Sequence, residues 1–350
     1  MMINYLNLLV ATGMKPVLFI YADGAGMGMD QQLSPKVKVI YGFKSGIFKH
    51  FKRISTLRKA LYDNNVCKII SFATNGVYLS MIASLFSRYQ RTPIIYRMVS
   101  IYSAVTDVGN RTLNRISVYA YLRVLCRRVD FIISQTVEMG RLLQEKNPIL
   151  LRSKIYPISN FVDIKAIEEK SGKVVKLPDE YIIYVGRLSE EKQVKYIIEA
   201  YHRISNMIKQ NLLIVGDGAD KEELISMVRE KGLESRVIFE GKQHNPYPYI
   251  VGADILVLFS RYEGFPNVLI ESMLCKTAVI SSTFAGVDEI INHKENGYLV
   301  ENGNLDDLAN AIIYLSNNIE KREQIILNAY KDVLHKNIQA QDKYVQLAIK

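Results

Sequence analysis

The segment from Ser260 to Glu271 carries the most specific chemistry in the chain, with the sequence SRYEGFPNVLIE. It follows the apolar run 254–259, which predicts a buried strand, and Pro266 is well suited to the first turn of a helix. Gly264 lets a ligand approach the backbone closely. Deeper in the helix, the carboxylate of Glu271 can accept both hydroxyls of a ribose. The helix start would direct several backbone amides at a phosphate or sugar oxygen, namely those of Gly264, Phe265, Asn267 and Val268.

Glu263 lies in the loop at the mouth of this predicted helix. A carboxylate beside a phosphate site is repelled unless sugar hydroxyls or cations are its partners, and this conflict points to a functional site. The alternative is a capping role for Glu263 at the helix N-terminus, with Glu271 as an exposed helical residue.

A second charged segment, GRLSEEK at 186–192, follows the apolar run 181–185. Gly186 and Arg187 are followed by Lys192 at the expected start of a helix. A guanidinium and an ammonium can neutralise the charge that develops on a departing diphosphate. Arg and Lys at a helix start also occur on solvated surfaces, so this pattern is weak by itself.

Alternating strands and helices position both segments, as in doubly wound α/β proteins. In the first half, apolar runs predict buried parallel strands at 17–22, 68–72, 93–96 and 131–134, with helices at 51–63, 76–89 and 111–128. In the second half, strands are expected at 181–185, 212–215, 236–239, 254–259 and 278–281, and helices at 193–209, 220–231, 266–275, 286–291 and 305–316. We therefore predict two Rossmann-like domains in tandem.

The domain boundary is expected in the polar stretch 163–179. We assign 1–163 to a first domain, 164–332 to a second domain and 333–350 to a closing helix. In open α/β sheets, ligands bind beyond the carboxyl ends of the strands. Both charged segments lie at such ends in the second domain.

Composition excludes several classes of protein. A chain of 350 residues that is 49% hydrophobic can bury a core in each of two domains, which argues against disorder. The absence of long uninterrupted apolar windows and of a basic leader predicts a cytoplasmic protein. The histidines and the three cysteines show no metal-ligand spacing, so we expect no metal or other cofactor. The cysteines are expected to be reduced and mostly buried: Cys67, Cys126 and Cys275.

Positive charge is concentrated in the first half. Residues up to Asp163 hold 22 Lys and Arg against 8 Asp and Glu, whereas the remainder holds 23 against 27. A basic half indicates an anionic partner, such as a membrane surface, a nucleic acid or a phosphorylated substrate. A solvated basic surface is the alternative. The basic helix expected at 111–128 either rests on anionic lipid headgroups or packs in the core with basic ends.

The second half resembles the donor site of family-four retaining glycosyltransferases, which have the GT-B fold. The spacing from Glu263 to Glu271 matches their pair of glutamates around an E-G-F-P core. Further similar segments follow in the family's order: 159–163, Gly186 and Arg187, Lys192, 215–218, 239–241, 285–291 and 296–300. The resemblance covers about residues 155 to 316, and the first half is similar only in its alternation of strands and helices.

The resemblance implies a role for each matched residue. Arg187 and Lys192 would bind the donor diphosphate, Glu271 the ribose, and Glu263 with the following amides the transferred sugar. Gly218 would belong to the donor site, and Lys242 to a loop that contacts the base through its backbone. The implied reaction retains anomeric configuration without a metal, with two GT-B domains facing a cleft, and we favour a UDP-linked donor over GDP or ADP.

Two features depart from this family. Its first strand and glycine-rich loop have no counterpart here, because residues 4–12 predict a helix and 17–22 the second strand. The histidine that some relatives carry near the sugar is also missing, and Arg97 at that strand end is a candidate wall residue or a structural one. The spacing G-x-G-x-G at 24–28 is similar to a dinucleotide-binding loop, but no helix is predicted after it.

These observations support a hexosyltransferase acting on a lipid-linked or polysaccharide acceptor, in cell-surface glycan synthesis such as lipopolysaccharide or capsule, at the inner face of the membrane. An alternative is a non-catalytic GT-B binding protein without the opening strand. A nucleic-acid binder is a third reading, but no recognition motif favours it.

Overall fold

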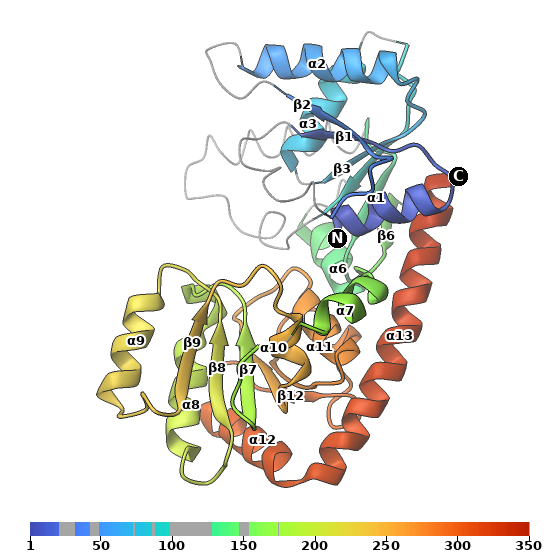
Figure 1. Cartoon of the computed structure of the whole chain (residues 1–350). Helices are drawn as coiled ribbons and strands as arrows, with labels where there is room; N and C mark the ends of the chain where they lie inside the picture. Colours follow the sequence, from blue (N-terminus) through green and yellow to red (C-terminus); the bar gives the residue numbers. More distant parts are fainter. Residues whose placement is uncertain are drawn as a thin grey trace. The chain divides into compact units, whose positions relative to one another are not determined.

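The computed structural model describes residues 1–20, 32–42, 49–72, 74–85, 88–98, 128–146, 154–173 and 175–349. The chain divides into two compact units (Figure 1). Unit 1 comprises residues 1–161 and 339–350, and unit 2 comprises residues 162–338. The sequence analysis expected the first domain to end at residue 163, and unit 1 ends its first segment at residue 161.

Unit 2 is built on a six-stranded sheet in which every neighbouring pair of strands is parallel. The strand order is β12-β11-β10-β7-β8-β9, so β7 lies near the centre. The strands are almost wholly apolar because both faces of the sheet are covered. Their bounds are β7 Tyr181–Val185, β8 Asn211–Val215, β9 Val237–Gly241, β10 Ile255–Leu258, β11 Ala278–Ser282 and β12 Tyr298–Val300.

Helices α8, α9 and α12 of unit 2 each bury one apolar stripe. In α8 the spacing of three and four residues puts Val194, Ile197 and Ile198 on one buried stripe. Side-chain caps satisfy two helix starts, since Asp163 accepts from the Ala166 amide and Asn304 from the Asp307 amide. The helices are α7 Ile164–Ser171, α8 Val194–Ile204, α9 Lys221–Glu230, α10 Tyr247–Val251, α11 Asn267–Leu274 and α12 Leu305–Asn317.

Unit 1 contains two separate parallel sheets among its described residues. One pairs β1 with β2, and the other has the order β3-β4-β5-β6. The strands are β1 Val17–Ile20, β2 Lys38–Tyr41, β3 Ile69–Phe72, β4 Ile94–Arg97, β5 Phe131–Ser134 and β6 Ile155–Pro157. The helices are α1 Met2–Ala11, α2 Lys49–Asp63, α3 Thr74–Ser84 and α6 Val137–Lys146.

The long helix α13, Ile319–Ile349, contributes to both units. Its last part packs in unit 1, where the ring of Tyr344 lies 5.0 Å from that of Tyr5 and 5.6 Å from that of Phe161. The Lys68 ammonium donates to the carbonyls of Leu347 and Ala348, which closes the helix end. Residues 333–350, expected as a separate closing helix, are therefore the second part of one continuous helix.

All nine predicted strands are present, but three were missed: β2, β6 and β12. The helix expected at 286–291 is wrong, because only a 3₁₀ turn forms at Val287–Glu289 after Gly286, whose φ is +85°. Part of the expected linker is helix α7. The predicted helix at 111–128 and the glycine-rich loop at 24–28 lie outside the described residues, apart from Arg128.

Candidate functional site

The loops after β7 and β10 leave the sheet of unit 2 side by side. These two strands are neighbours, and the chain continues from β7 to β8 on one side and from β10 to β11 on the other. In open parallel sheets such a reversal of strand order creates the crevice where ligands bind. The β7 loop contains Arg187 and Lys192, and the β10 loop contains Glu263.

An ion pair joins the two loops. Lys192 ends a single 3₁₀ turn, Glu190–Lys192, and its Nζ lies 2.5 Å from Oε1 of Glu263. The Ser260 hydroxyl donates to the same carboxylate oxygen at 2.8 Å. Both partners are largely buried, with side-chain exposures of 16% for Lys192 and 11% for Glu263. The carboxylate thus has the cationic partner that its predicted place beside a phosphate site requires.

Arg187 is held less tightly than Lys192. Its side chain is 75% exposed and its Nη2 lies 3.2 Å from Oε1 of Glu191. The backbone of Glu191 is in turn fixed to the β10 loop, because its carbonyl accepts from the amide of Arg261 at 2.9 Å. Hydrogen bonding to its own backbone amide lowers the pKa of the Glu191 carboxyl, so this partner stays ionised near neutral pH.

Glycines allow the β7 and β8 loops to pack closely. A Cβ at Gly216 would lie 1.8 Å from the carbonyl oxygen of Gly186, and one at Gly218 would lie 2.1 Å from that of Leu188. A Cβ at Gly186 would meet the hydroxyl of Tyr184 at 2.6 Å, and this hydroxyl donates to the Arg187 carbonyl. Gly186 and Gly218, both predicted as donor residues, have this structural reason for lacking a side chain.

The amides at the start of α11 differ from the expectation in two respects. Pro266 is the residue before the helix rather than part of its first turn, and the helix begins at Asn267. The Asn267 amide donates to the Phe265 carbonyl at 2.9 Å, so it is already used. Within the described residues, the amides of Gly264, Phe265 and Val268 have no such acceptor. Three of the four predicted donors therefore remain available at this helix end.

Glu271 lies in α11 and is half-buried. Its Oε1 is 3.5 Å from the hydroxyl of Tyr247 in α10. Burial raises the pKa of the Glu271 carboxyl and that of Tyr247, and it raises the pKa of the nearby Cys275 thiol to about 12. Sequence reasoning missed Tyr247, because no motif links it to a residue 24 positions away in the chain.

Lys242 follows β9, where Gly241 turns the chain with a φ of +66°. The Gly241 carbonyl accepts from the Gly216 amide at 2.9 Å, so this loop lies beside the one after β8. The Lys242 side chain is exposed. Lys242 therefore lies at the same edge of the sheet as the loops after β7 and β8. The strand before it, β9, is the last strand on that side of the sheet.

Arg97 has the environment of a structural residue. It ends β4 and is 2% exposed, and its Nε donates to the Tyr344 hydroxyl at 3.1 Å. Its Nη2 donates to Oδ1 of Asn160. The guanidinium thus connects β4 to α13 and to Asn160. Because the side chain is buried, the structure does not support a place for Arg97 in the wall of a ligand cleft.

Among the described residues no cluster of His, Cys, Asp and Glu could hold a metal ion. Cys275 is buried as expected, but Cys67 is exposed, and Cys126 lies outside the described part. None of the helices in the described ranges has the length and apolar character to cross a bilayer.

Residues 165–332 match the family model described as glycosyl transferases group 1. The match covers slightly less than half of the chain. This segment lies entirely in unit 2 and contains all the catalytic and donor-binding residues predicted from the sequence. The resemblance seen in the Glu263 to Glu271 pattern is thereby confirmed at the level of the family.

Two curated relatives share part of this domain. An N-acetylgalactosamine-N,N'-diacetylbacillosaminyl-diphospho-undecaprenol 4-alpha-N-acetylgalactosaminyltransferase from Campylobacter jejuni is 37% identical over 143 residues, which are 41% of this chain and 39% of the relative. N-acetyl-alpha-D-glucosaminyl L-malate synthase from Bacillus anthracis is 29% identical over 183 residues, covering 50% of this chain and 48% of the relative. The chain thus spans less than half the length of either.

The similarity to solved structures covers both units of the chain. HepE from Anabaena, solved in complex with UDP, superposes with a TM-score of 0.78 over 98% of this chain and 94% of its own, at 17% sequence identity. At this identity the match shows the fold alone. The predicted GT-B class, with two Rossmann-like units, is confirmed by this likeness together with the parallel sheets of both units.

Proposed function

We propose that this chain is a retaining glycosyltransferase that moves a sugar from a nucleoside diphosphate sugar to a lipid-linked or polysaccharide acceptor. The observation that carries the proposal is the ion pair of Lys192 and Glu263, because it joins two loops at the reversal of strand order in a parallel sheet. The group 1 domain, and relatives named for the transfer of amino sugars, support it.

The diphosphate of the donor is bound between the β7 and β10 loops. Arg187 is 75% exposed, and within the described residues its guanidinium is bonded only through a surface ion pair, which contributes less than about 1 kcal/mol, so it can move to a ligand at little cost. Lys192 is held in place by Glu263. The amides of Gly264, Phe265 and Val268, which have no backbone acceptor within the described residues, donate from the start of α11.

The nucleoside is bound deeper along α11 and at the end of β9. Glu271 accepts the two ribose hydroxyls, which replace the long 3.5 Å contact with Tyr247 by shorter bonds. The loop at Lys242 contacts the base through its backbone. UDP is the favoured diphosphate, and the complex of HepE with UDP is in keeping with that choice.

The reaction breaks the bond between the anomeric carbon and the phosphate oxygen, and the acceptor oxygen bonds the same carbon on the same face. The departing phosphate takes the acceptor proton. Arg187 and Lys192 stabilise the negative charge that develops on the diphosphate, and Glu263 with the adjacent amides orients the sugar. In this scheme no metal is required, because the two cations perform the charge neutralisation.

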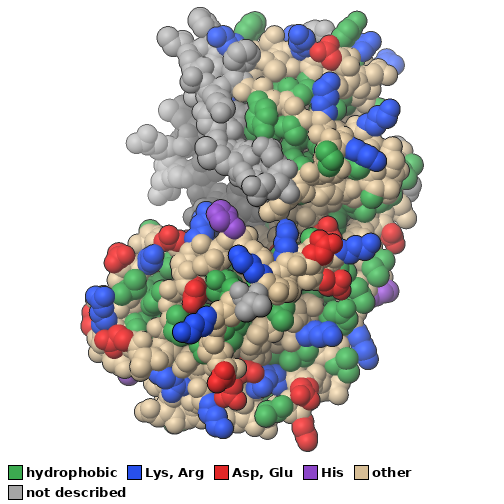
Figure 2. All heavy atoms as spheres, viewed as in Figure 1, with side chains coloured by type: hydrophobic (Ala, Val, Ile, Leu, Met, Phe, Trp, Pro, Cys, Tyr) green, Lys and Arg blue, Asp and Glu red, His purple; other side chains and the backbone are tan. Residues whose placement is uncertain are grey.

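The acceptor is assigned to unit 1. The chain up to Asp163 holds 22 Lys and Arg against 8 Asp and Glu. On the face drawn in Figure 2, the charged side chains on the described surface of unit 1 are mainly basic, whereas those of unit 2 are of both signs. A basic surface attracts phosphate-linked lipid acceptors and anionic headgroups. We therefore place the enzyme in the cytoplasm, peripheral to the membrane, in cell-surface glycan synthesis.

A panel of UDP-, GDP- and ADP-sugars tests the proposal through hydrolysis of the donor and through thermal protection, with and without EDTA. We expect a UDP-sugar to be hydrolysed slowly and to protect the chain in both conditions. Arg187→Ala should chiefly lower turnover, Glu271→Ala should weaken nucleotide binding, and Arg229→Ala on the exposed face of α9 should change neither. The proposal is wrong if no nucleotide sugar protects the chain, or if the two site variants match the control.

A further inference from the structure

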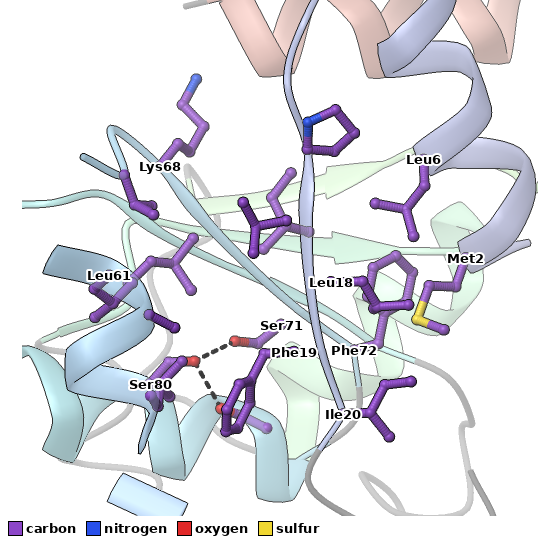
Figure 3. A pocket seen from close by; sticks show the side chains of 18 of the residues that line it. Met2, Leu6, Leu18, Phe19, Ile20, Leu61, Lys68, Ser71, Phe72 and Ser80 are labelled. Atoms are coloured by element: carbon purple, nitrogen blue, oxygen red, sulfur yellow. Dashed lines mark hydrogen bonds between the residues drawn. The ribbon is translucent and has the colours of Figure 1, made fainter. Parts of the chain in front are cut away.

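Buried serine hydroxyls lie in or just after strands in both units. In unit 1, Ser71 of β3 and Ser80 of α3 are bonded at 2.9 Å beside an apolar cavity of about 330 Å³ (Figure 3). Ser80 also donates to the carbonyl of Gly76 in its own helix. Within the described residues of unit 1, this network joins a strand to a helix and reaches no charged group. In unit 2, by contrast, the buried hydroxyl of Ser260 donates to the carboxylate of Glu263.

Ser260 is the residue through which the end of β10 fixes Glu263. It follows β10 and is 0% exposed. Its hydroxyl donates to Oε1 of Glu263 at 2.8 Å, and the Lys192 ammonium donates to the same oxygen. Within the described residues, Oε2 of this carboxylate has no such donor. One oxygen of Glu263 is therefore fixed, and the other is available to a sugar hydroxyl.

The peptide unit between Ser260 and Arg261 is bonded on both sides. Its carbonyl accepts from the Ser282 hydroxyl at 2.8 Å and from Nδ2 of Asn302 at 2.7 Å. A carbonyl oxygen has two lone pairs, so both are used here. The amide of the same peptide unit, that of Arg261, donates to the Glu191 carbonyl at 2.9 Å. Bonds from β11, from the loop after β12 and from the loop after β7 thus fix the peptide from which the Ser260 side chain projects.

Asn302 lies in the loop between β12 and α12, 42 positions from Ser260 in the chain. The loop is anchored to the end of β11, because the Asn302 amide donates to the Thr283 hydroxyl at 3.4 Å and the Thr283 amide donates to the Val300 carbonyl at 2.9 Å. The side chain is half-buried. It must present Nδ2 to the Ser260 carbonyl, because an amide oxygen cannot donate.

We propose that Asn302 and Ser260 are positioning residues for the transferred sugar. Asn302 fixes the Ser260 peptide, and the Ser260 hydroxyl fixes the Glu263 carboxylate. The inference rests on the proposed function, in which Glu263 orients the sugar. A displacement of about 1 Å in such a group can cost a large factor in rate, whereas the nucleotide is bound by other residues. Loss of either bond should therefore lower turnover more than it weakens nucleotide binding.

The test compares Ser260→Ala, Ser260→Thr and Asn302→Ala with Ser281→Ala in the full chain. Ser281 is the matched control, because it is also 0% exposed and lies in β11, but its hydroxyl donates to the adjacent Ser282 carbonyl at 3.1 Å. The substrate is whichever UDP-, GDP- or ADP-sugar the native chain hydrolyses fastest. The measurements are kcat and KM for that hydrolysis, calorimetric affinity for the matching nucleoside diphosphate, and Tm.

We expect Ser260→Ala to lower kcat about 30-fold, as for one lost hydrogen bond to a charged group, and Asn302→Ala to lower it about fivefold. Ser260→Thr keeps the hydroxyl and should restore kcat to within about fivefold of the native value. Affinity for the nucleoside diphosphate should stay within about twofold in every variant, since one neutral hydrogen bond far from the nucleotide contributes little to it. A purely structural role would instead lower kcat, diphosphate affinity and Tm together.

Hydrogen exchange at the Arg261 amide tests the positioning without turnover. Asn302→Ala should speed this exchange by at least about tenfold, because the peptide loses one of its two carbonyl bonds, and Ser281→Ala should not change it. A native chain that hydrolyses none of the nucleotide sugars overturns the proposed function and this inference with it. An active native chain overturns this inference alone if the Ser260 and Asn302 variants turn over like Ser281→Ala, if they lose kcat and diphosphate affinity in parallel, or if exchange at Arg261 is unchanged in Asn302→Ala.

Discussion

Removing the Lys192 ammonium tests the junction of the two loops. Both side chains of the pair are largely buried, at 16% and 11% exposure. In Lys192→Met the Glu263 carboxylate keeps the Ser260 hydroxyl as its one partner among the described residues, and an uncompensated buried charge costs about 3 kcal/mol. Glu263→Gln keeps an amide oxygen near the ammonium and should cost about 2 kcal/mol. The double variant leaves no unpaired charge, so we expect about 3 kcal/mol for it and a coupling of about 2 kcal/mol.

Thermal unfolding followed by circular dichroism measures this coupling. For a domain of this size, about 1 kcal/mol corresponds to about 3 °C in Tm, so the predicted coupling is about 6 °C. The matched control is the ion pair of Arg203 and Asp306, which is as short at 2.6 Å but exposed at 43% and 83%. Its coupling should not exceed about 0.5 kcal/mol. A coupling for Lys192 and Glu263 no larger than this control would refute the reasoning.

Three further predictions concern other parts of the molecule. Burial raises the pKa of the Glu271 carboxyl, so native stability should fall as pH rises through that pKa, and Glu271→Gln should be more stable than the native chain at pH 8 but not at pH 4 in urea unfolding. Gly216→Ala should lose about 2 kcal/mol or more of unfolding free energy, because its Cβ would lie 1.8 Å from the Gly186 carbonyl; an unchanged urea midpoint would contradict this. Arg97→Met should lose about 3 kcal/mol by breaking the bonded network that includes Tyr344, while nucleotide affinity measured by calorimetry stays the same.

The sequence predicts the strands well because parallel strands buried on both faces are continuous apolar runs, as in YIIYV and DILVLF. The missed strands have a different character. In β2 the pattern of exposure leaves two residues at the surface, and β6 and β12 have only three residues each. Short or half-exposed strands depend on their neighbours for stability, and periodicity cannot detect that dependence.

The sequence predicts those parts of the candidate site that depend on residues close together in the chain. It does not predict contacts between residues that lie far apart in the chain. The glycine, proline and glutamate residues of the segment 260–271 predicted that Glu263 lies at the start of a helix. The ends of the predicted strands indicated that Lys192 lies at the same edge of the sheet. The contact of Tyr247 with Glu271 arises only when α10 and α11 pack together. The use of the Asn267 amide by Phe265 also depends on the loop conformation, which no residue type specifies. Tertiary packing therefore decides which predicted donors remain available.

Calorimetry with nucleotides tests most directly whether one pyrophosphate bridges the two loops. UDP, GDP and ADP are each titrated against their nucleosides, using the native chain, Arg187→Ala and Arg229→Ala. A free diphosphate carries the charge that develops on the leaving group, so we predict that UDP binds more tightly than uridine and that Arg187→Ala reduces UDP affinity about tenfold without affecting uridine. A diphosphate that binds no better than its nucleoside, for all three bases, would contradict the account.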